Sequence, residues 1–306
     1  MSPQIRDVER MVEPVMVSEG AGVRLKRTIA SRKLDYLDPF LLLDHFGSDN
    51  PADYLAGFPM HPHRGIETVT YMLEGFVRHK DSLGNAGTIG PGDVQWMTAG
   101  SGIMHEEMPR PDGNRMYGFQ LWVNLPAKRK MTRPRYQEFA ADKIPEVEGD
   151  GGSRVRVVAG EAAGVQGPVR EIAISPTYLD VEVPARSTFT HPVERGHTAF
   201  AYAFEGQGSF GPNGEVISAL SLVIYGDGDR VQVRAGKEPL RFLLVSGKPL
   251  HEPVARYGPF VMNTREEIQQ ALHDLRDGTF VKVQPQTESD SWYGSALLDR
   301  KEGDRG

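Results

Sequence analysis

Two closely spaced pairs of side chains in the first half of the chain have the chemistry of metal ligands. His61 and His63 flank a proline, and His105 and Glu107 flank a second glutamate further along. In a β-strand, residues two apart project from the same face, so each pair can present two ligands to one ion. Three imidazoles and one carboxylate leave coordination positions for water, a substrate or dioxygen. The spacing therefore predicts one mononuclear metal site built from His61, His63, His105 and Glu107.

Other polar residues compete for a place at this site. A single His-X-His pair is often an accident of a surface strand, and the second pair is what favours a metal site here. Strand alternation should turn Glu106 away from the ion. His79 lies in a polar strand-and-turn segment, where we expect it to be exposed. His45 and Asp44 either lie near the mouth of the site or belong to a strand that covers the barrel, and the structural role is favoured.

The composition limits the partners and the metal chemistry. The chain has no cysteine, which excludes disulfide bonds and thiolate metal ligands. Nitrogen and oxygen ligands leave Fe(II), Mn, Ni, Co, Cu or Zn as candidate ions. The net charge is −6 and the pI about 5.9, so the chain lacks the overall positive charge that is typical of proteins that bind nucleic acid directly. No apolar run is long enough for a membrane span, and the polar N-terminus lacks a signal peptide, so we expect a soluble, cytoplasmic protein.

Short apolar runs between turn residues predict an all-β protein. Runs of this kind lie at 67–73, 118–125, 177–183 and 241–247, and glycine and proline recur between them. The best helix signal spans 264–276, where Thr264 and Glu267 form a capping-box pattern. The fold is therefore expected to be a β-sandwich or barrel with few short helices.

An internal repeat divides the chain into two similar halves. HPHRGIETVTYMLEG at 61–75 matches HPVERGHTAFAYAFEG at 191–206, and GPGDVQWMTAG at 90–100 matches YGDGDRVQVRAG at 225–236. This predicts an N-terminal barrel over 1–135, a connecting segment over 136–153, a C-terminal barrel over 154–290 and a polar tail over 291–306. In the second half Val193 replaces the second histidine of the pair, and His197 is displaced. We therefore expect the metal in the N-terminal barrel only.

Several longer segments resemble the cupin superfamily and, within it, the pirin family. They are DPFLLLDHFG (38–47), GFPMHPHRGIETVTYMLEG (57–75), PGDVQWMTAGSGIMHEEMP (91–109), GFQLWVNLP (118–126) and SGKPLHEPVARYGPFVMNT (246–264). The resemblance implies two tandem cupin barrels of the double-stranded β-helix, jelly-roll-like type. Thr68 occupies the position where the general cupin pattern has its glutamate, and Glu67 is one place early, so it should point out of the barrel. The resemblance to pirins assigns the carboxylate ligand to Glu107 instead.

The same resemblance implies an activity. Pirin-like proteins bind iron, and several act as quercetin 2,3-dioxygenases that open the flavonol ring with dioxygen. Glu107 would then be catalytic, accepting the proton of the flavonol hydroxyl. Phe58, Met60, Trp96 and Met97 either line a flat aromatic pocket or fill the barrel core.

A second hypothesis makes the metal structural or redox-sensing, in a protein that regulates transcription or a metabolic enzyme through a protein partner. In either case two fused barrels already bury one interface between them, so a monomer is expected.

Overall fold

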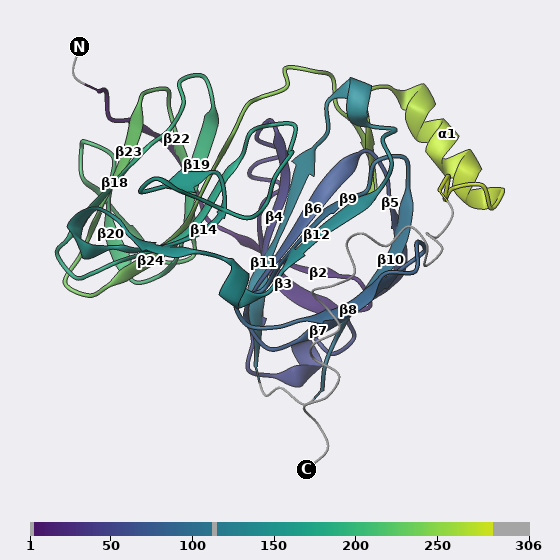
Figure 1. The fold of residues 1–306 in the computed structure, drawn as a ribbon, viewed down its shortest axis with the longest axis horizontal. Coiled ribbons are helices and arrows are strands. Elements are labelled where there is room, and N and C mark those ends of the chain that lie inside the picture. Colours follow the sequence, from purple (N-terminus) through teal and green to yellow (C-terminus); the bar gives the residue numbers. More distant parts are fainter. Residues whose placement is uncertain (1–2, 112–114, 284–306) are drawn as a thin grey trace.

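The computed structural model describes residues 3–111 and 115–283, and these form two β-barrels that lie side by side (Figure 1). Each barrel pairs a seven-stranded antiparallel sheet with a four-stranded one. This confirms the expected all-β architecture, and the described residues hold one α-helix, α1 (Arg265–Arg276). No helix in this part of the chain is long and apolar enough to cross a membrane. The predicted tail, 291–306, lies outside the described residues.

The N-terminal barrel consists of sheets with the strand orders β12-β9-β6-β11-β4-β3-β2 and β5-β10-β7-β8. Its strands are β2 (Val15–Glu19), β3 (Val23–Ile29), β4 (Phe40–Ser48), β5 (Phe58–His63), β6 (Ile66–Glu74), β7 (Val77–Asp81), β8 (Ala86–Ile89), β9 (Val94–Thr98), β10 (Ile103–Pro109), β11 (Met116–Asn124) and β12 (Arg135–Phe139). The short 3-10 helices η1 (Pro51–Asp53) and η2 (Ala127–Arg129) lie in its loops.

The C-terminal barrel has the strand orders β1-β22-β19-β24-β17-β14-β13 and β18-β23-β20-β21. Its strands are β1 (Val8–Val12), β13 (Glu146–Glu148), β14 (Arg154–Ala159), β17 (Thr177–Val183), β18 (Thr188–Pro192), β19 (Thr198–Glu205), β20 (Gln207–Phe210), β21 (Glu215–Ser218), β22 (Ser221–Tyr225), β23 (Arg230–Ala235) and β24 (Leu240–Gly247). Two small ribbons, β15 (Glu161–Ala162) with β16 (Val165–Gln166) and β25 (Ala255–Tyr257) with β26 (Phe260–Met262), and the 3-10 helices η3 (Ala141–Lys143) and η4 (Asp150–Gly152) complete the described elements.

The sheets cross the boundaries predicted from the sequence at three places. Strand β1, at the start of the chain, pairs with β22 of the C-terminal barrel. The expected connecting segment, 136–153, contributes most of β12 to the N-terminal sheet and β13 to the C-terminal one. The end of the described chain returns to the N-terminal barrel, where Phe260 bridges to Arg64. Strand β1 thus extends one edge of the C-terminal sheet, whereas Phe260 belongs to the small β25-β26 ribbon and reaches the N-terminal barrel through its bridge to Arg64.

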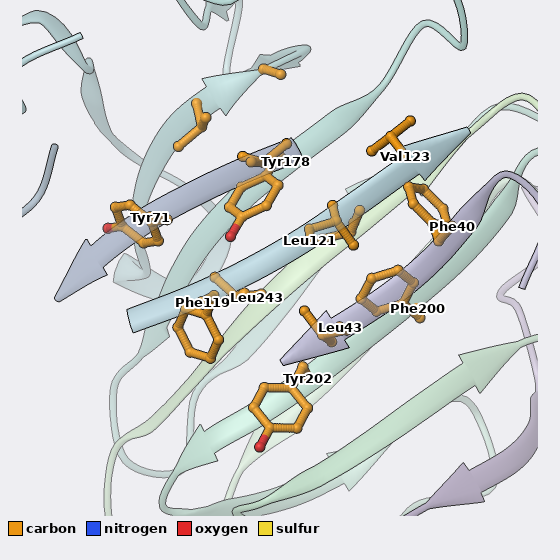
Figure 2. Packing of buried hydrophobic residues seen from close by; sticks show 14 of the residues in the cluster. Phe40, Leu43, Tyr71, Phe119, Leu121, Val123, Tyr178, Phe200, Tyr202 and Leu243 are labelled. Carbon is orange, nitrogen blue, oxygen red and sulfur yellow. The ribbon is translucent and has the colours of Figure 1, made fainter. Parts of the chain in front are cut away.

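A large apolar core joins the two barrels. Strands β4, β6 and β11 face β17, β19 and β24 across it, with aromatic and aliphatic side chains interleaved (Figure 2). Phe40 meets Phe200 edge-on, with ring centroids 5.1 Å apart. Tyr71 donates a hydrogen bond of 2.7 Å to the carboxylate of Asp180 at its edge. The contact between the barrels is thus a hydrophobic core of its own, which fixes the barrels relative to each other.

Alternation along β6 sends successive residues to this shared core and to the N-terminal barrel's interior. Val69 and Tyr71 are buried against the C-terminal barrel. Thr70, between them, lines the cavity inside the N-terminal barrel. The C-terminal barrel has a different interior, because apolar side chains such as Phe189, Ala201 and Phe242 fill it.

The C-terminal helix begins where the capping pattern predicts. The Thr264 hydroxyl accepts a hydrogen bond from the Glu267 amide, and the Glu267 carboxylate accepts one from the Thr264 amide. Ile268 and Ala271 are buried beneath the helix, whereas Leu275 is 37% exposed. In Figure 1 the helix lies at the edge of the N-terminal barrel, away from the C-terminal barrel.

Candidate metal centre

Strands β5 and β10 pair antiparallel and carry the predicted ligands. His61 lies opposite His105, and His63 lies opposite Ile103. The register shifts after His105, so that Glu107 pairs with Phe58. The extra residue lies on β5, and β10 keeps an unbroken register with β7, so Glu107 retains the two-residue alternation with His105 from which its position was predicted.

The three histidines converge inside the N-terminal barrel. One ring nitrogen from each of His61, His63 and His105 lies within 4.8 Å of the others. The Nε2 atoms of His61 and His63 are 3.1 Å apart. The Nδ1 atom of His61 is 2.9 Å from the carbonyl oxygen of Pro59. Donation from Nδ1 to that carbonyl leaves the Nε2 lone pair of His61 free to bind an ion.

The unpaired polar atoms of the cluster fit a metal ion. Both ring nitrogens of His105 and the Nδ1 atom of His63 are buried without a hydrogen-bond partner in the described chain. Buried polar atoms without partners are costly, and a metal would satisfy a lone pair that no protein donor reaches. Burial first, and neighbouring imidazoles next, lower the pKa of His63 and His105 far below the usual range. The two rings are therefore neutral near pH 7, as metal ligands must be.

Glu107 lines the same cavity as His61 and His63 but lies outside the group of three histidines. Its Oε1 atom is 3.1 Å from the Thr70 hydroxyl, which is also 2.8 Å from the Gln120 side-chain oxygen. A hydroxyl has one proton, so Thr70 donates to one of these oxygens at a time. The group of convergent ligand atoms contains the three histidines and not Glu107, whose carboxylate contacts Thr70. Glu107 as the fourth ligand therefore stays a prediction.

The two other glutamates point away from the centre, as strand alternation predicts. Glu106 forms an ion pair with Lys80 at 3.0 Å. Glu67 is 3% exposed and accepts hydrogen bonds from the Trp96 indole and the Thr98 hydroxyl. It lies on the outer face of β6, where burial raises the pKa of its carboxyl.

The expectation that His79 is exposed was wrong. It is 6% exposed, stacks against Tyr136 and lies 2.9 Å from the Glu138 carboxylate. The polar sequence around it alternates along β7, so that His79 points inward while its neighbours face solvent. His45 belongs to the core between the barrels, where its Nδ1 atom is 3.1 Å from the Tyr202 hydroxyl.

A cavity of about 460 Å³ opens beside the histidines and Glu107. Leu25, Leu42, Phe46, Phe58, Val77 and Trp122 supply much of its apolar wall. Of the four residues proposed from the sequence, only Phe58 lines it. Met60 is 44% exposed, and Trp96 and Met97 are buried in apolar cores.

Part of the cavity wall comes from residues that the sequence did not single out. Arg256, Gly258 and Pro259 reach it from the returning end of the chain. On another side, Arg27 binds the Asp44 carboxylate through two hydrogen bonds of 2.7 Å. Asp44 thus lies at the cavity and is paired, while its neighbour His45 faces the other barrel.

The fold and the histidine cluster define a bicupin with a candidate metal centre in its first barrel. Family models of Pirin and of the Pirin C-terminal cupin domain match residues 22–123 and 178–281. A pirin-like protein of Caulobacter vibrioides is 49% identical over 90% of this chain and 99% of its own length. The chain belongs to the pirin family, as the sequence motifs indicated.

Two further relatives extend the comparison. Human pirin is 45% identical over 85% of this chain and 89% of its own length. A structure described as quercetin 2,3-dioxygenase from Acinetobacter baumannii superposes with a TM-score of 0.83, at 36% identity, over 90% of this chain and 98% of that one.

Proposed function

We propose that this protein is a metal-dependent dioxygenase that opens the ring of a flavonol such as quercetin with dioxygen. The observation that carries the proposal is the cluster of three convergent histidines, two of which, His61 and His63, line a cavity of about 460 Å³. That volume lies within the range of small-molecule sites. The name and structural likeness of the Acinetobacter baumannii protein support the flavonol as substrate class.

His61, His63 and His105 would hold one divalent ion, with Glu107 as the fourth ligand. Three nitrogens and one carboxylate accept several ions, and we propose Fe(II), which the resemblance to pirins implies, over Mn, Ni, Co, Cu or Zn. When bound, the metal supplies Lewis-acid activation of the substrate hydroxyl and a means of coupling it to dioxygen.

Glu107 is the proposed general base. Its carboxylate lies on the cavity, and the Thr70 hydroxyl holds one of its oxygens at 3.1 Å. A carboxylate in this place can accept the proton of a flavonol hydroxyl and return it to the product. When the Thr70 hydroxyl donates to Glu107 rather than to Gln120, it orients the acceptor oxygen, which then needs little rearrangement when the substrate enters.

The apolar walls position the substrate and exclude water. Phe58 and Trp122 both line the cavity next to histidines: the Phe58 ring lies 6.3 Å from the His61 ring, and Trp122 meets the His63 ring edge-on at 5.1 Å. Aromatic faces of this kind bind planar rings by stacking. The proposed setting for the reaction is the cytoplasm, with the protein acting as a monomer.

The direct test is an aerobic assay with quercetin after separate reconstitution with Fe, Mn, Ni, Co and Cu. Loss of the flavonol absorbance together with release of carbon monoxide would support the proposal. Stoichiometric metal without turnover for any of these ions would contradict it. That result would favour the alternative of a metal-containing regulator acting through a protein partner.

A further inference from the structure

Arg256, an exposed residue, places a positive charge on the wall of the cavity in the N-terminal barrel. It belongs to β25, which follows the last strand of the C-terminal barrel. Its guanidinium lies over the Trp122 ring, 5.2 Å from the centroid. One of its nitrogens, Nη1, donates a hydrogen bond of 3.2 Å to the Leu41 carbonyl. These two contacts fix the plane of the guanidinium at the cavity wall.

Arg256 has no carboxylate partner, unlike the other arginine of the cavity. Arg27 is neutralised by Asp44 at 2.7 Å and by Glu19 at 2.6 Å. Across residues 3–111 and 115–283, no ion pair within 4.0 Å involves Arg256. Its remaining N–H donors are therefore available to a ligand in the cavity. A guanidinium held in this way binds carboxylates and other oxyanions in a bidentate geometry.

The guanidinium of Arg256 lies next to the candidate metal centre. Trp122 links them, because its indole contacts both the His63 ring, at 5.1 Å between centroids, and the Arg256 guanidinium, at 5.2 Å from the ring centroid. A planar molecule that places an oxygen at the histidines can therefore extend along Trp122 toward Arg256. The cavity joins both positions, since His61, His63 and Arg256 all line it.

We infer that Arg256 is a specificity-determining residue that pairs with an anionic group of a planar aromatic substrate, beside Trp122. The substrate class of the cavity is then aromatic acids, which include ionised phenols such as flavonols. This inference rests on the proposed function for the end of the substrate that reaches the metal. The anion pairing itself requires only the guanidinium, the indole and the open cavity.

A matched pair of probes tests the charge requirement without turnover. The full-length protein is loaded with zinc, which does not change oxidation state, and titrated with 2-naphthoate and 2-naphthamide. The two probes have nearly the same shape, and only the first is anionic. We expect 2-naphthoate to bind about tenfold more tightly, the difference typical of one hydrogen-bonded charge pair. Arg256→Gln should abolish this preference and leave the affinity for 2-naphthamide within about twofold.

Two further variants separate charge from shape. Arg256→Lys should retain part of the preference, because it keeps the charge without the planar fork. Arg234→Gln, on an exposed position of the C-terminal barrel, should leave both affinities unchanged. An equal loss for both probes in Arg256→Gln would show that Arg256 only shapes the cavity, and would overturn the inference. If Arg256→Gln still preferred 2-naphthoate to the same extent, the carboxylate would be bound by the metal rather than by Arg256, and the inference would also be overturned.

The inference and the proposed function can fail separately. Absence of quercetin turnover with any metal would contradict the dioxygenase proposal, while a charge preference lost in Arg256→Gln would still establish an anion site. Turnover of quercetin in a protein that binds both naphthalene probes equally would support the dioxygenase and contradict the role of Arg256.

Discussion

Arg64 and Asp274 form a buried ion pair, with 2.7 Å between Nη1 and the carboxylate. Arg64 directly follows His63, and Asp274 lies in the C-terminal helix α1. The guanidinium also donates to the carbonyl oxygens of Ser101 and Phe280. Helix α1 is thereby tied to the residue that follows β5, the strand that carries two of the three histidines, so the helix supports the candidate metal centre from outside the barrel.

This relationship predicts a large effect of Asp274→Asn on stability. The substitution leaves the charge of Arg64 buried without its partner, and we expect a loss of about 3 kcal/mol in the free energy of unfolding. Denaturant unfolding followed by circular dichroism measures it. Asp277→Asn is the control, because Asp277 is 65% exposed and pairs with Arg276 only at 3.7 Å. Similar small losses for both variants would contradict the structural role of the ion pair.

Glu107 should be needed for turnover, and Glu106 should not. Glu107→Gln keeps the size of the side chain and its contact with Thr70 but removes the base, so we expect turnover of quercetin to fall at least about 100-fold. Glu106→Gln changes the adjacent residue, which pairs with Lys80 on the opposite face, and serves as the matched control. Steady-state rates on protein of equal metal content make the comparison. Equal rates for the two variants would remove Glu107 from the reaction.

Much of the architecture follows from local patterns in the sequence. The repeat of His-Pro, Arg-Gly and Glu-Gly predicted two similar barrels because the same strand and turn chemistry occurs twice. The capping pair Thr264 and Glu267 predicted where α1 begins, since these two side chains satisfy its first amides locally. The exchange of β1 into the C-terminal sheet could not be predicted, because its partner β22 lies about two hundred residues away and pairing at a sheet edge depends on the assembled barrel.

The candidate site divides in the same way. Strand alternation correctly predicted that Glu67 and Glu106 point away from the histidines, because that rule involves only neighbouring residues of one strand. His79 was misplaced, since its burial depends on Tyr136 and Glu138 from a strand far along the chain. Arg256 was missed for a related reason. It reaches the cavity only because the chain returns to the first barrel after completing the second.

The contact between the barrels should depend on Asp180. Its carboxylate accepts hydrogen bonds from the Tyr71 hydroxyl and from the Arg241 guanidinium, each at 2.7 Å. Asp180→Ala leaves the Tyr71 hydroxyl and the Arg241 guanidinium without this hydrogen-bond acceptor. We expect the free energy of unfolding to fall by about 3 kcal/mol. Tyr71→Phe removes one hydrogen bond and should cost about 1 kcal/mol.

Glu182→Gln, two residues along the same strand, is the control for the interface. Glu182 pairs with Arg154 near the surface, so this change should alter the unfolding free energy by less than about 1 kcal/mol. Thermal and denaturant unfolding of the four proteins would decide the matter. A ranking in which Glu182→Gln is as harmful as Asp180→Ala would contradict the proposed importance of the interface.

Two buried histidines outside the metal centre should make the protein sensitive to acid. Burial lowers the pKa of His45 to about 3 and that of His191 to about 4. In the unfolded chain both protonate near the usual value of about 6.5, whereas the folded protein keeps them neutral. Between about pH 6.5 and pH 4 the unfolded state therefore binds more protons, and stability falls as the pH falls.

The slope of stability against pH checks this prediction. Each histidine contributes up to about 1.4 kcal/mol per pH unit, so His45→Gln should flatten the dependence by that amount between about pH 5.5 and 4.5. Unfolding free energies of the wild type and the variant at several pH values provide the test. Parallel curves for the two proteins would mean that His45 is not held neutral between the barrels.

The metal content of the purified protein tests the central claim most directly. Elemental analysis of the wild type should find close to one equivalent of divalent metal, and His105→Ala should lose nearly all of it, because His105 is the proposed ligand whose two ring nitrogens both lack a partner in the described chain. Glu106→Gln, one residue away and facing outward, should retain it. Stoichiometric metal in His105→Ala would contradict a centre built on His61, His63 and His105.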